Sequence, residues 1–487
     1  MAAPEGTGAT TPSAPALTAA TAAAYEFFLE LGDYAFRHHP PDIWINASTL
    51  ARKGVVGPAS SVKPRTLRRR VAHAGGPTWA YLRETVRHRV RRRRHDPHPP
   101  DGPDQVLAAW PFGRRDYVGL IAPVLTRLAK GGVRCGVLTI PTGLDSWRDA
   151  AADHRIPVRA LPAALEPGVH REARRLFASL RPSVDDLAAR FRLDRGTRAA
   201  LHGYFVAYTF DKVLAGRHLE RLTPDVVLGI HFVTRRGWQG ALHDAAARGR
   251  KSTVLLMQHG AFSADEAFHD FEGADVALVW GERWRRELGG FATLPFAPLP
   301  GVAVSGNPKY DTSTPWLAPP AHAGTPRVLY VSNHGGGHET LVEPLRLTID
   351  ASRQGDGFDL VVRLHPVEKR GAVIDLVDRG LLASRQLAPA SEPLADAILG
   401  ADVVVGPPST TLFEAARLGR PVVVIADRPA RIFDGFRATS DVAQLWTWVR
   451  NCVAVDAVAA QAPIVADLFG SPGGACNRTV ALVRRHL

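Results

Sequence analysis

The sequence contains little cysteine and no long apolar run. Its three cysteines, Cys135, Cys452 and Cys476, lie far apart and without metal-ligand spacing, so we expect neither a disulfide framework nor a zinc ribbon. No stretch approaches the about 18 apolar residues that suggest a membrane-spanning helix. The N-terminus lacks the basic-then-apolar order of a secretory signal, and residues 1–24 are predicted to be a disordered leader. These absences favour a reducing, cytoplasmic location.

The composition is that of an ordinary globular protein. Of the 487 residues, 45% are hydrophobic, 22% are charged and 8% are aromatic, which argues against intrinsic disorder. A chain of this length exceeds what one hydrophobic core normally organises, so two domains are the first expectation.

Positive charge is concentrated in one segment. The formal net charge is +13, and the stretch from Arg52 to Arg94 holds 14 of the 60 Lys and Arg residues but one of the 47 acidic residues, so the rest of the chain is neutral. Apolar residues from Trp79 to Val90 share one helical face and arginines occupy another, which suits an anionic membrane surface. We therefore expect residues 52–95 to dock peripherally at the inner face of the plasma membrane. A solvated basic linker is the alternative, whereas nucleic-acid binding is disfavoured because no reader motif accompanies the arginines.

Beyond the Pro-rich stretch that ends at Pro103, strands and helices alternate. Strands are predicted at residues 105–110, 135–140, 225–230, 253–257, 276–279 and 302–305, with a mainly helical stretch at 143–222. After a second Pro-rich stretch, strands are predicted at 327–331, 359–363, 403–405 and 421–425, with helices at about 338–354, 372–381, 393–399 and 411–418. Because these strands are apolar throughout, they predict parallel sheets with helices on both faces.

The expected fold class is therefore α/β, with two doubly wound Rossmann-like domains around a central cleft and a basic N-terminal helical extension. The predicted units are a leader at 1–24, the basic extension at 25–103, the first domain at 104–313, a linker at 314–326 and the second domain at 327–487. Ligands of such sheets gather at the carboxyl ends of the strands, so the motifs at these ends are the candidate sites.

Three candidates belong to the first domain. His259, in Gln258-His259-Gly260, directly follows a strand, where an imidazole can take a proton from a hydroxyl near neutral pH; the alternative is a histidine that hydrogen-bonds a neighbouring loop. Lys309 lies in the turn Gly306-Asn-Pro-Lys-Tyr-Asp311, which is either purely structural or allows the lysine to reach a phosphate. Arg114, in the loop after the first strand, is a further candidate for contacting a phosphate or an acceptor.

A glycine-rich loop opens the second domain. The segment Ser332-Asn333-His334-Gly335-Gly336-Gly337 lies between a strand and a helix, where backbone amides can bind an anion. His-Gly-Gly-Gly also occurs in lipase oxyanion loops, but the chain has no Gly-x-Ser-x-Gly elbow, so a hydrolase of that kind is excluded.

Two further motifs follow strands of the second domain. His365, before Pro366, ends a strand and could donate a hydrogen bond to a diphosphate oxygen. Ser409, Thr410 and Thr411 stand at the start of a predicted helix, where they either only cap the helix or form an anion site. Glu414, about one turn later, could reach a ribose hydroxyl.

These motifs, taken in order, resemble the two-domain GT-B glycosyltransferase superfamily, and most closely the CDP-glycerol glycerophosphotransferases of teichoic-acid synthesis and the bacterial sialyl- and polysialyltransferases. The resemblance covers about residues 225–430. It implies that His365-Pro366 and Ser409-Thr410 hold the donor phosphate and nucleotide, and that His259 is the base. Two departures are that Glu414 replaces the aspartate that usually follows the paired serines of the polymerases, and that the loop at 332–337 is not of the polymerase form.

The resulting hypothesis is an inverting, metal-independent transferase without a cofactor. Its substrates would be a nucleotide-activated donor of the CMP, CDP or UDP type and an acceptor with a free hydroxyl, for which a lipid-linked acceptor is one option. The product would be a surface polysaccharide or a teichoic-acid-like polymer. His259 would deprotonate the acceptor, and His365 would stabilise charge on the leaving phosphate. The predicted donor contacts are Ser332, Asn333, Gly335, Gly336, Ser409, Thr410, Thr411 and Glu414. No Asp-x-Asp metal anchor stands at a strand end.

Two other classes of function fit parts of the sequence. A nucleotide-sugar 2-epimerase has the same two-domain design, but it would need extra carboxylates in the first-domain cleft. A non-enzymatic binder of nucleotides or nucleic acid would use the arginine-rich segment.

Overall fold

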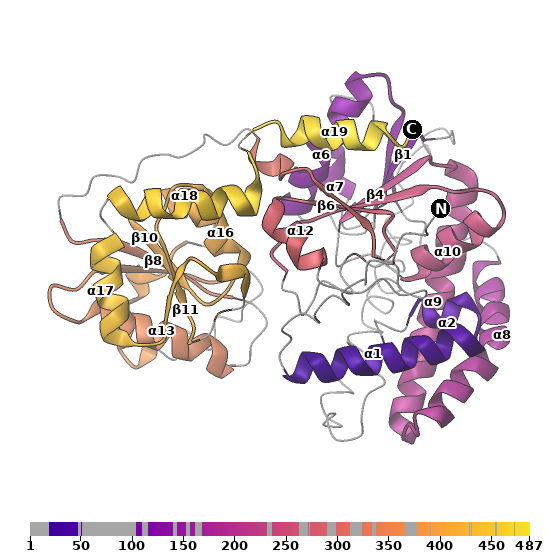
Figure 1. Ribbon diagram of the computed structural model, residues 1–487, viewed down its shortest axis with the longest axis horizontal. Coiled ribbons are helices and arrows are strands. Elements are labelled where there is room, and N and C mark those ends of the chain that lie inside the picture. Colours follow the sequence, from indigo (N-terminus) through magenta and orange to yellow (C-terminus); the bar gives the residue numbers. More distant parts are fainter. Residues whose placement is uncertain are drawn as a thin grey trace, which may run out of the picture.

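The computed structural model contains two parallel β-sheets, each flanked by helices (Figure 1). The described residues are 19–46, 50, 104–109, 115–139, 144–151, 156–160, 168–230, 236–262, 271, 273–289, 299–311, 324–333, 338–365, 377–389, 391–427, 429, 431–452, 455–471 and 473–487. The basic segment 52–95, most of the predicted linker 314–326, and Arg114, Gly335 and Gly336 lie outside these residues. The expectations for these parts of the chain therefore stay predictions.

The first sheet has the strand order β3-β2-β1-β4-β5-β6-β7, and its strands are parallel. The strands are β1 (Val106–Ala109), β2 (Cys135–Thr139), β3 (Val158–Ala160), β4 (Val226–Ile230), β5 (Thr253–Met257), β6 (Val276–Val279) and β7 (Gly301–Val304). The chain builds outward from β1 in one direction and then, from β4, in the other. This reversal opens a crevice at the carboxyl ends of β1 and β4, where ligands of such sheets bind.

The second sheet has the order β12-β11-β10-β8-β9 and is also parallel. Its strands are β8 (Arg327–Val331), β9 (Asp359–Arg363), β10 (Val403–Gly406), β11 (Val422–Ile425) and β12 (Arg437–Thr439). Here the order reverses between β8 and β10. The segments that follow these two strands, at 332–333 and 407–409, therefore flank the crevice of this sheet.

Helices lie on both faces of the two sheets, and further helices lie beside the first sheet (Figure 1). The helices of the first part are α1 (Ala19–His38), α2 (Pro41–Trp44), α6 (Arg115–Lys130), α7 (Leu144–Ala151), α8 (Val169–Arg190), α9 (Arg195–Leu222), α10 (Arg236–Ala247) and α12 (Glu282–Gly289), with the short η3 (Pro308–Tyr310). Those that follow are α13 (His338–Ser352), α15 (Leu394–Leu399), α16 (Thr410–Arg417), α17 (Val442–Cys452), α18 (Val455–Phe469) and α19 (Ala475–Arg484), with η4 (Ser384–Gln386) and η5 (Arg431–Phe433).

No single helix among the described residues has the length and hydropathy to span a membrane. The pair Val442–Cys452 and Ala457–Phe469 passes the same test together, but its two helices meet at 96°.

Most of the expected strands are present, and the fold class is confirmed. The strands β5, β6, β8 and β9 have the predicted bounds, and the 143–222 stretch is mainly helical. Three expectations need correction. The short edge strands β3 and β12 were not predicted, α1 begins at Ala19, inside the expected leader, and α19 does not lie on the second sheet.

The last helix returns to the first domain. In Figure 1, α19 lies beside α6, far along the chain from it. Arg127 of α6 donates to Asn477, and Arg484 donates to the carbonyl oxygen of Gly131 at 3.4 Å. Cys476, Val480 and Val483 are buried against the core of the first sheet, which explains why α19 packs there and not on the second sheet.

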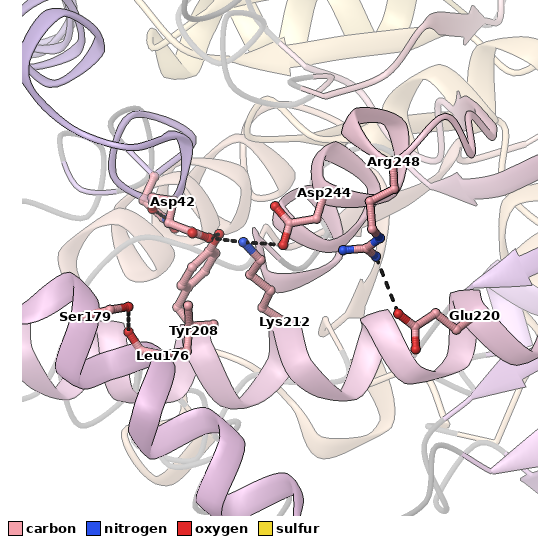
Figure 2. Close-up of polar contacts among 9 residues, drawn as sticks. Asp42, Leu176, Ser179, Tyr208, Lys212, Glu220, Asp244 and Arg248 are labelled. Atoms are coloured by element: carbon pink, nitrogen blue, oxygen red, sulfur yellow. Dashed lines mark hydrogen bonds and ion pairs between the residues drawn. The ribbon is translucent and has the colours of Figure 1, made fainter.

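The N-terminal helices are fastened to the first domain by a buried ion pair. Figure 2 shows Lys212 of α9 between Asp42 of α2 and Asp244 of α10, with Nζ–Oδ distances of 2.5 and 2.8 Å. Tyr208 also donates to Asp42, and burial together with this carboxylate raises the pKa of Tyr208 well above its ordinary value. A buried charge is tolerable only with such partners, so this cluster fixes α2 on α9 and α10.

We expect Lys212→Met to lower the free energy of unfolding by about 3–5 kcal/mol, because it leaves Asp42 buried without its cation. The double variant Asp42→Asn, Lys212→Met should lose less, since it removes both charges. Lys251→Met is the control, because the Lys251 side chain is 74% exposed and should change stability by no more than about 0.5 kcal/mol. Urea unfolding measures all three, and equal stability of Lys212→Met and the control would contradict the role of the pair.

The three cysteines are buried thiols. Burial raises the pKa of Cys135 to about 12 and also raises the pKa values of Cys452 and Cys476. Because the thiolate is the reactive form, raised pKa values leave very little of it near pH 8. We expect the folded protein to react slowly with Ellman's reagent at pH 8 and to release three equivalents after unfolding in guanidinium. A fast stoichiometric reaction of the folded chain would contradict this.

Candidate functional site

The turn that carries His259 is held rigidly at the end of β5. Gln258 is fully buried; its Nε2 donates to the carbonyl oxygen of Gly260 at 3.0 Å, and its Oε1 accepts from the backbone N–H of Trp280 at 2.9 Å. The indole N–H of Trp280 donates to the backbone carbonyl of Gln258 at 2.7 Å. The glutamine amide therefore ties the backbone after His259 to Trp280, and the indole of Trp280 holds the backbone before it.

Tyr117 of α6 contacts the His259 ring. The two rings meet edge to face at 4.9 Å between centroids, and the tyrosine hydroxyl lies 3.5 Å from Nε2 of the half-buried His259. Tyr117 is 6% exposed, so the contact lies inside the protein. Neither Tyr117 nor the amide of Gln258 was predicted from the sequence; the available signal for Gln258 was a polar residue at the end of an apolar strand.

In the second domain, Ser332 positions His365. The backbone N–H of Ser332 donates to the carbonyl oxygen of Arg363 at 3.1 Å, and its hydroxyl oxygen accepts from the backbone N–H of His365 at 2.8 Å. Ser332 is buried and His365 is half-buried. The hydroxyl that was expected to contact a donor therefore fixes the backbone on which His365 stands.

The start of α16 lies on the other side of this crevice. Asn333 donates through Nδ2 to the carbonyl oxygen of Pro408 at 2.5 Å, which joins the segment after β8 to the segment after β10. The Oγ of Ser409, the N-cap residue of α16, is buried and makes no hydrogen bond with any residue that the structure describes. The first N–H groups of a helix also lack intrahelical acceptors, so this end of α16 suits an anion.

The two domains meet where these two parts of the site come together. The backbone N–H of Ala261 donates to Oγ1 of Thr410 at 2.9 Å, and a Cβ on Gly260 would lie 3.3 Å from the same oxygen. The His259 turn is thus adjacent to Ser409 and Thr410, and the hydrogen bonds of Ser332 and Asn333 connect that end of α16 to the loop of His365. Thr411, the next residue, is half-exposed.

Glu414 and Lys309 form an ion pair between the two domains. Glu414 accepts hydrogen bonds from Lys309 Nζ, at 3.1 Å, and from the hydroxyl of Tyr310. Burial, followed by the carboxylate of Glu414, raises the pKa of Tyr310 well above its ordinary value. In this structure Glu414 and Lys309 contact each other, because the helical period turns Glu414 toward the first domain. The predicted contacts of Glu414 with a ribose and of Lys309 with a phosphate stay predictions.

The turn at 306–311 also joins the last helix to the first sheet. Asp311 accepts from the backbone N–H groups of Ala475 and Cys476, at 2.8 and 2.6 Å, where α19 begins. Asn307 accepts from the backbone N–H of Lys309 at 3.0 Å. Of the two interpretations of this turn, the structural one accounts for these contacts.

Among the described residues, no three His, Cys, Asp or Glu side chains are grouped so that they could hold a metal ion. Within the described part of the site, the contacts come from hydroxyl, amide, imidazole and backbone groups.

We expect Glu414→Ala to lower the free energy of unfolding by about 1–3 kcal/mol, because the buried Tyr310 hydroxyl loses its carboxylate acceptor. In a double-mutant cycle with Tyr310→Phe, the two losses should not add. Glu343→Ala is the control, since that side chain is 71% exposed on α13. Thermal or urea unfolding gives the coupling energy, and additive losses would contradict the pairing.

Comparisons with known proteins agree with this architecture. No protein-family model matches the sequence, and no curated protein matches it at a significant level. Among solved structures, a protein assigned as a UDP-N-acetylglucosamine 2-epimerase from Listeria monocytogenes matches with a TM-score of 0.50 and 13% identity, covering 79% of this chain and 96% of that one. UDP-GlcNAc 2-epimerase from Neisseria meningitidis, bound to UDP-GlcNAc, gives 0.49 and 14% over 78% and 100% of the two chains, and MurG from Acinetobacter baumannii gives 0.44 and 15% over 79% and 100%. At such identities the likeness concerns the fold alone, and the chain has the two-domain α/β GT-B fold.

Proposed function

We propose that this protein is a transferase that moves a glycosyl or glycerophosphate group from a nucleotide-activated donor to an acceptor hydroxyl. The observation that carries the proposal is the hydrogen bond from Ala261 to Thr410, because it puts the turn of His259 next to the N-terminus of α16 and the buried hydroxyl of Ser409. A base for an alcohol and a site for an anion are the two parts that such a transfer needs.

In this mechanism the donor diphosphate lies at the start of α16. The hydroxyl of Ser409 and the first N–H groups of the helix bind its oxygens, and the positive end of the helix dipole favours their charge. His365, on the loop held by Ser332, donates a hydrogen bond to the phosphate that leaves with the nucleotide. These groups are fixed before the donor arrives, so little reorganisation accompanies the reaction.

His259 acts on the acceptor. Its neutral imidazole accepts the proton of the acceptor hydroxyl while the oxygen attacks the transferred group, and the nucleotide leaves with the bonding electrons. Gln258 and Tyr117 restrict the movement of the ring, which keeps the base in one orientation. A direct displacement of this kind inverts the configuration of a transferred sugar carbon.

An epimerase is the second candidate, and it fits the site less well. The described residues that form the site, at 258–261, 332–333, 364–365 and 407–411, include no Asp or Glu. The nearby carboxylate of Glu414 is engaged by Lys309 and Tyr310. A transfer that relies on an imidazole base and backbone amides needs no further carboxylate.

The donor can be tested by thermal stabilisation with CMP, CDP, UDP and GDP, since a ligand that binds the folded state raises the melting temperature. We expect one pyrimidine nucleotide to stabilise the protein, and Ser409→Ala to weaken its binding about tenfold through the loss of a hydrogen bond to a charged group. Thr447→Ala, on an exposed part of α17, is the control and should bind like the wild type.

Measuring turnover beside nucleotide binding distinguishes the proposed roles of His259 and His365 from those of the groups that bind the donor. We expect His259→Ala to keep nucleotide binding and to lower turnover by about 10²–10⁴-fold, as for the loss of a general base, and His365→Ala to lower turnover as well. Donor consumption with a set of hydroxyl acceptors measures this. Stabilisation by none of the four nucleotides, or unchanged turnover in His259→Ala, would refute the proposal.

A further inference from the structure

One side of α16 lies against the first domain along its whole length. Thr410, Phe413, Glu414 and Arg417 follow the spacing i, i+3, i+4, i+7 and therefore share one helical face. Phe413 meets Trp284 edge to face at 5.8 Å, and Glu414 accepts from Lys309. Arg417 donates to the backbone carbonyl of Tyr310 at 3.2 Å. The helix proposed to bind the donor is thus docked on the domain that carries the base.

Thr410 is the member of this face that contacts the base turn. Its Oγ1 accepts the N–H of Ala261 at 2.9 Å. A hydroxyl has two acceptor positions and one proton of its own, so this bond leaves the proton of Thr410 available to a further acceptor. Thr410 is also the first residue of α16 and directly follows Ser409, so a phosphate bound at this helix end would lie within reach of that proton.

The base turn has little freedom on its other side. Gln258 and Trp280 fix it to the first sheet as far as the carbonyl oxygen of Gly260, and Thr410 accepts from the N–H of the next residue, Ala261. At Gly260 the backbone passes so close to Thr410 that even a Cβ would be 3.3 Å from Oγ1. A shift of Thr410 toward or away from the turn therefore moves the backbone next to His259.

We propose that Thr410 is a positioning residue that links donor binding to the base; this inference rests on the proposed function. The same hydroxyl accepts from Ala261 and donates to a phosphate oxygen of the donor. Binding of the donor holds Thr410 in place, and Thr410 holds the turn of His259 in the orientation that receives the acceptor proton. The coupling is reciprocal, so a fixed turn also favours donor binding.

Two variants separate the hydroxyl from the shape of the side chain. Thr410→Val keeps the branched shape and removes the acceptor and donor, whereas Thr410→Ser keeps the hydroxyl and removes the methyl group. Thr447→Val, on the exposed part of α17, is the matched control for a surface Thr-to-Val change.

The first measurement needs no nucleotide. The rate at which diethyl pyrocarbonate modifies His259, followed by peptide mass mapping, reports how open the turn is. We expect Thr410→Val to raise this rate about threefold or more, because the loss of the bond to Ala261 favours local opening, while Thr410→Ser stays close to the wild type. An unchanged rate in Thr410→Val would overturn the positioning role, whatever the reaction of the protein.

The second measurement is the pH dependence of turnover at saturating donor. We expect Thr410→Val to lower kcat about 10- to 100-fold, as a misplaced catalytic group does, and to shift the pH limb that reports His259. Nucleotide affinity, measured by calorimetry with the nucleotide that stabilises the wild type, should fall less than kcat, and Thr410→Ser should recover most of both.

The outcomes distinguish the two proposals. A wild type that binds no nucleotide and shows no turnover refutes the proposed function, and with it the donor half of this inference. A wild type that binds and turns over, together with a Thr410→Val variant whose kcat and pH profile match it, refutes the coupling alone. Equal losses in Thr410→Val and Thr410→Ser would also refute it, since they would assign the effect to shape and not to the hydroxyl.

Discussion

The packing of α16 against the first domain is the contact on which the arrangement of the candidate site depends. Trp280 stacks on Phe469 at 5.4 Å, and Trp284 meets Phe413, so aromatic rings from both domains form one continuous core. Polar contacts of Thr410 and Glu414 lie on the same seam. Interfaces between domains that are large and apolar restrict relative motion, so the arrangement of the candidate site is built into the folded state.

This interface between the domains also explains why one face of α16 and its N-terminal end have different contacts. One face supplies contacts between domains, and the N-terminal end, with the buried hydroxyl of Ser409, is the proposed ligand site. The first domain holds this end of the helix in place through the hydrogen bond from Ala261 to Thr410. The turn of His259 is held by the same contacts, so in the proposed mechanism the groups for leaving charge and for proton transfer are positioned by one set of interactions.

The sequence predicted the strands better than the contacts of the site. Apolar runs such as Thr253–Met257 are buried on both faces and are recognisable in isolation, whereas Val158–Ala160 and Arg437–Thr439 are too short, and each includes an arginine. His259 and Ser409 could be chosen as candidates from the sequence because motifs at strand ends face the crevice of such sheets. The partners of Glu414 could not be, because Lys309 and Tyr310 lie about a hundred residues away and meet it only when the domains dock.

The carboxylate of Asp311 joins the turn at 306–311 to the last helix. The chain leaves the first domain just after this residue and comes back to it at Ala475, and Asp311 grips the amides of Ala475 and Cys476 at that return. The end of the turn at 306–311 and the start of α19 are therefore held next to each other. Asp311 therefore adds a polar contact at the chain crossing to the aromatic and polar contacts that already join the two domains.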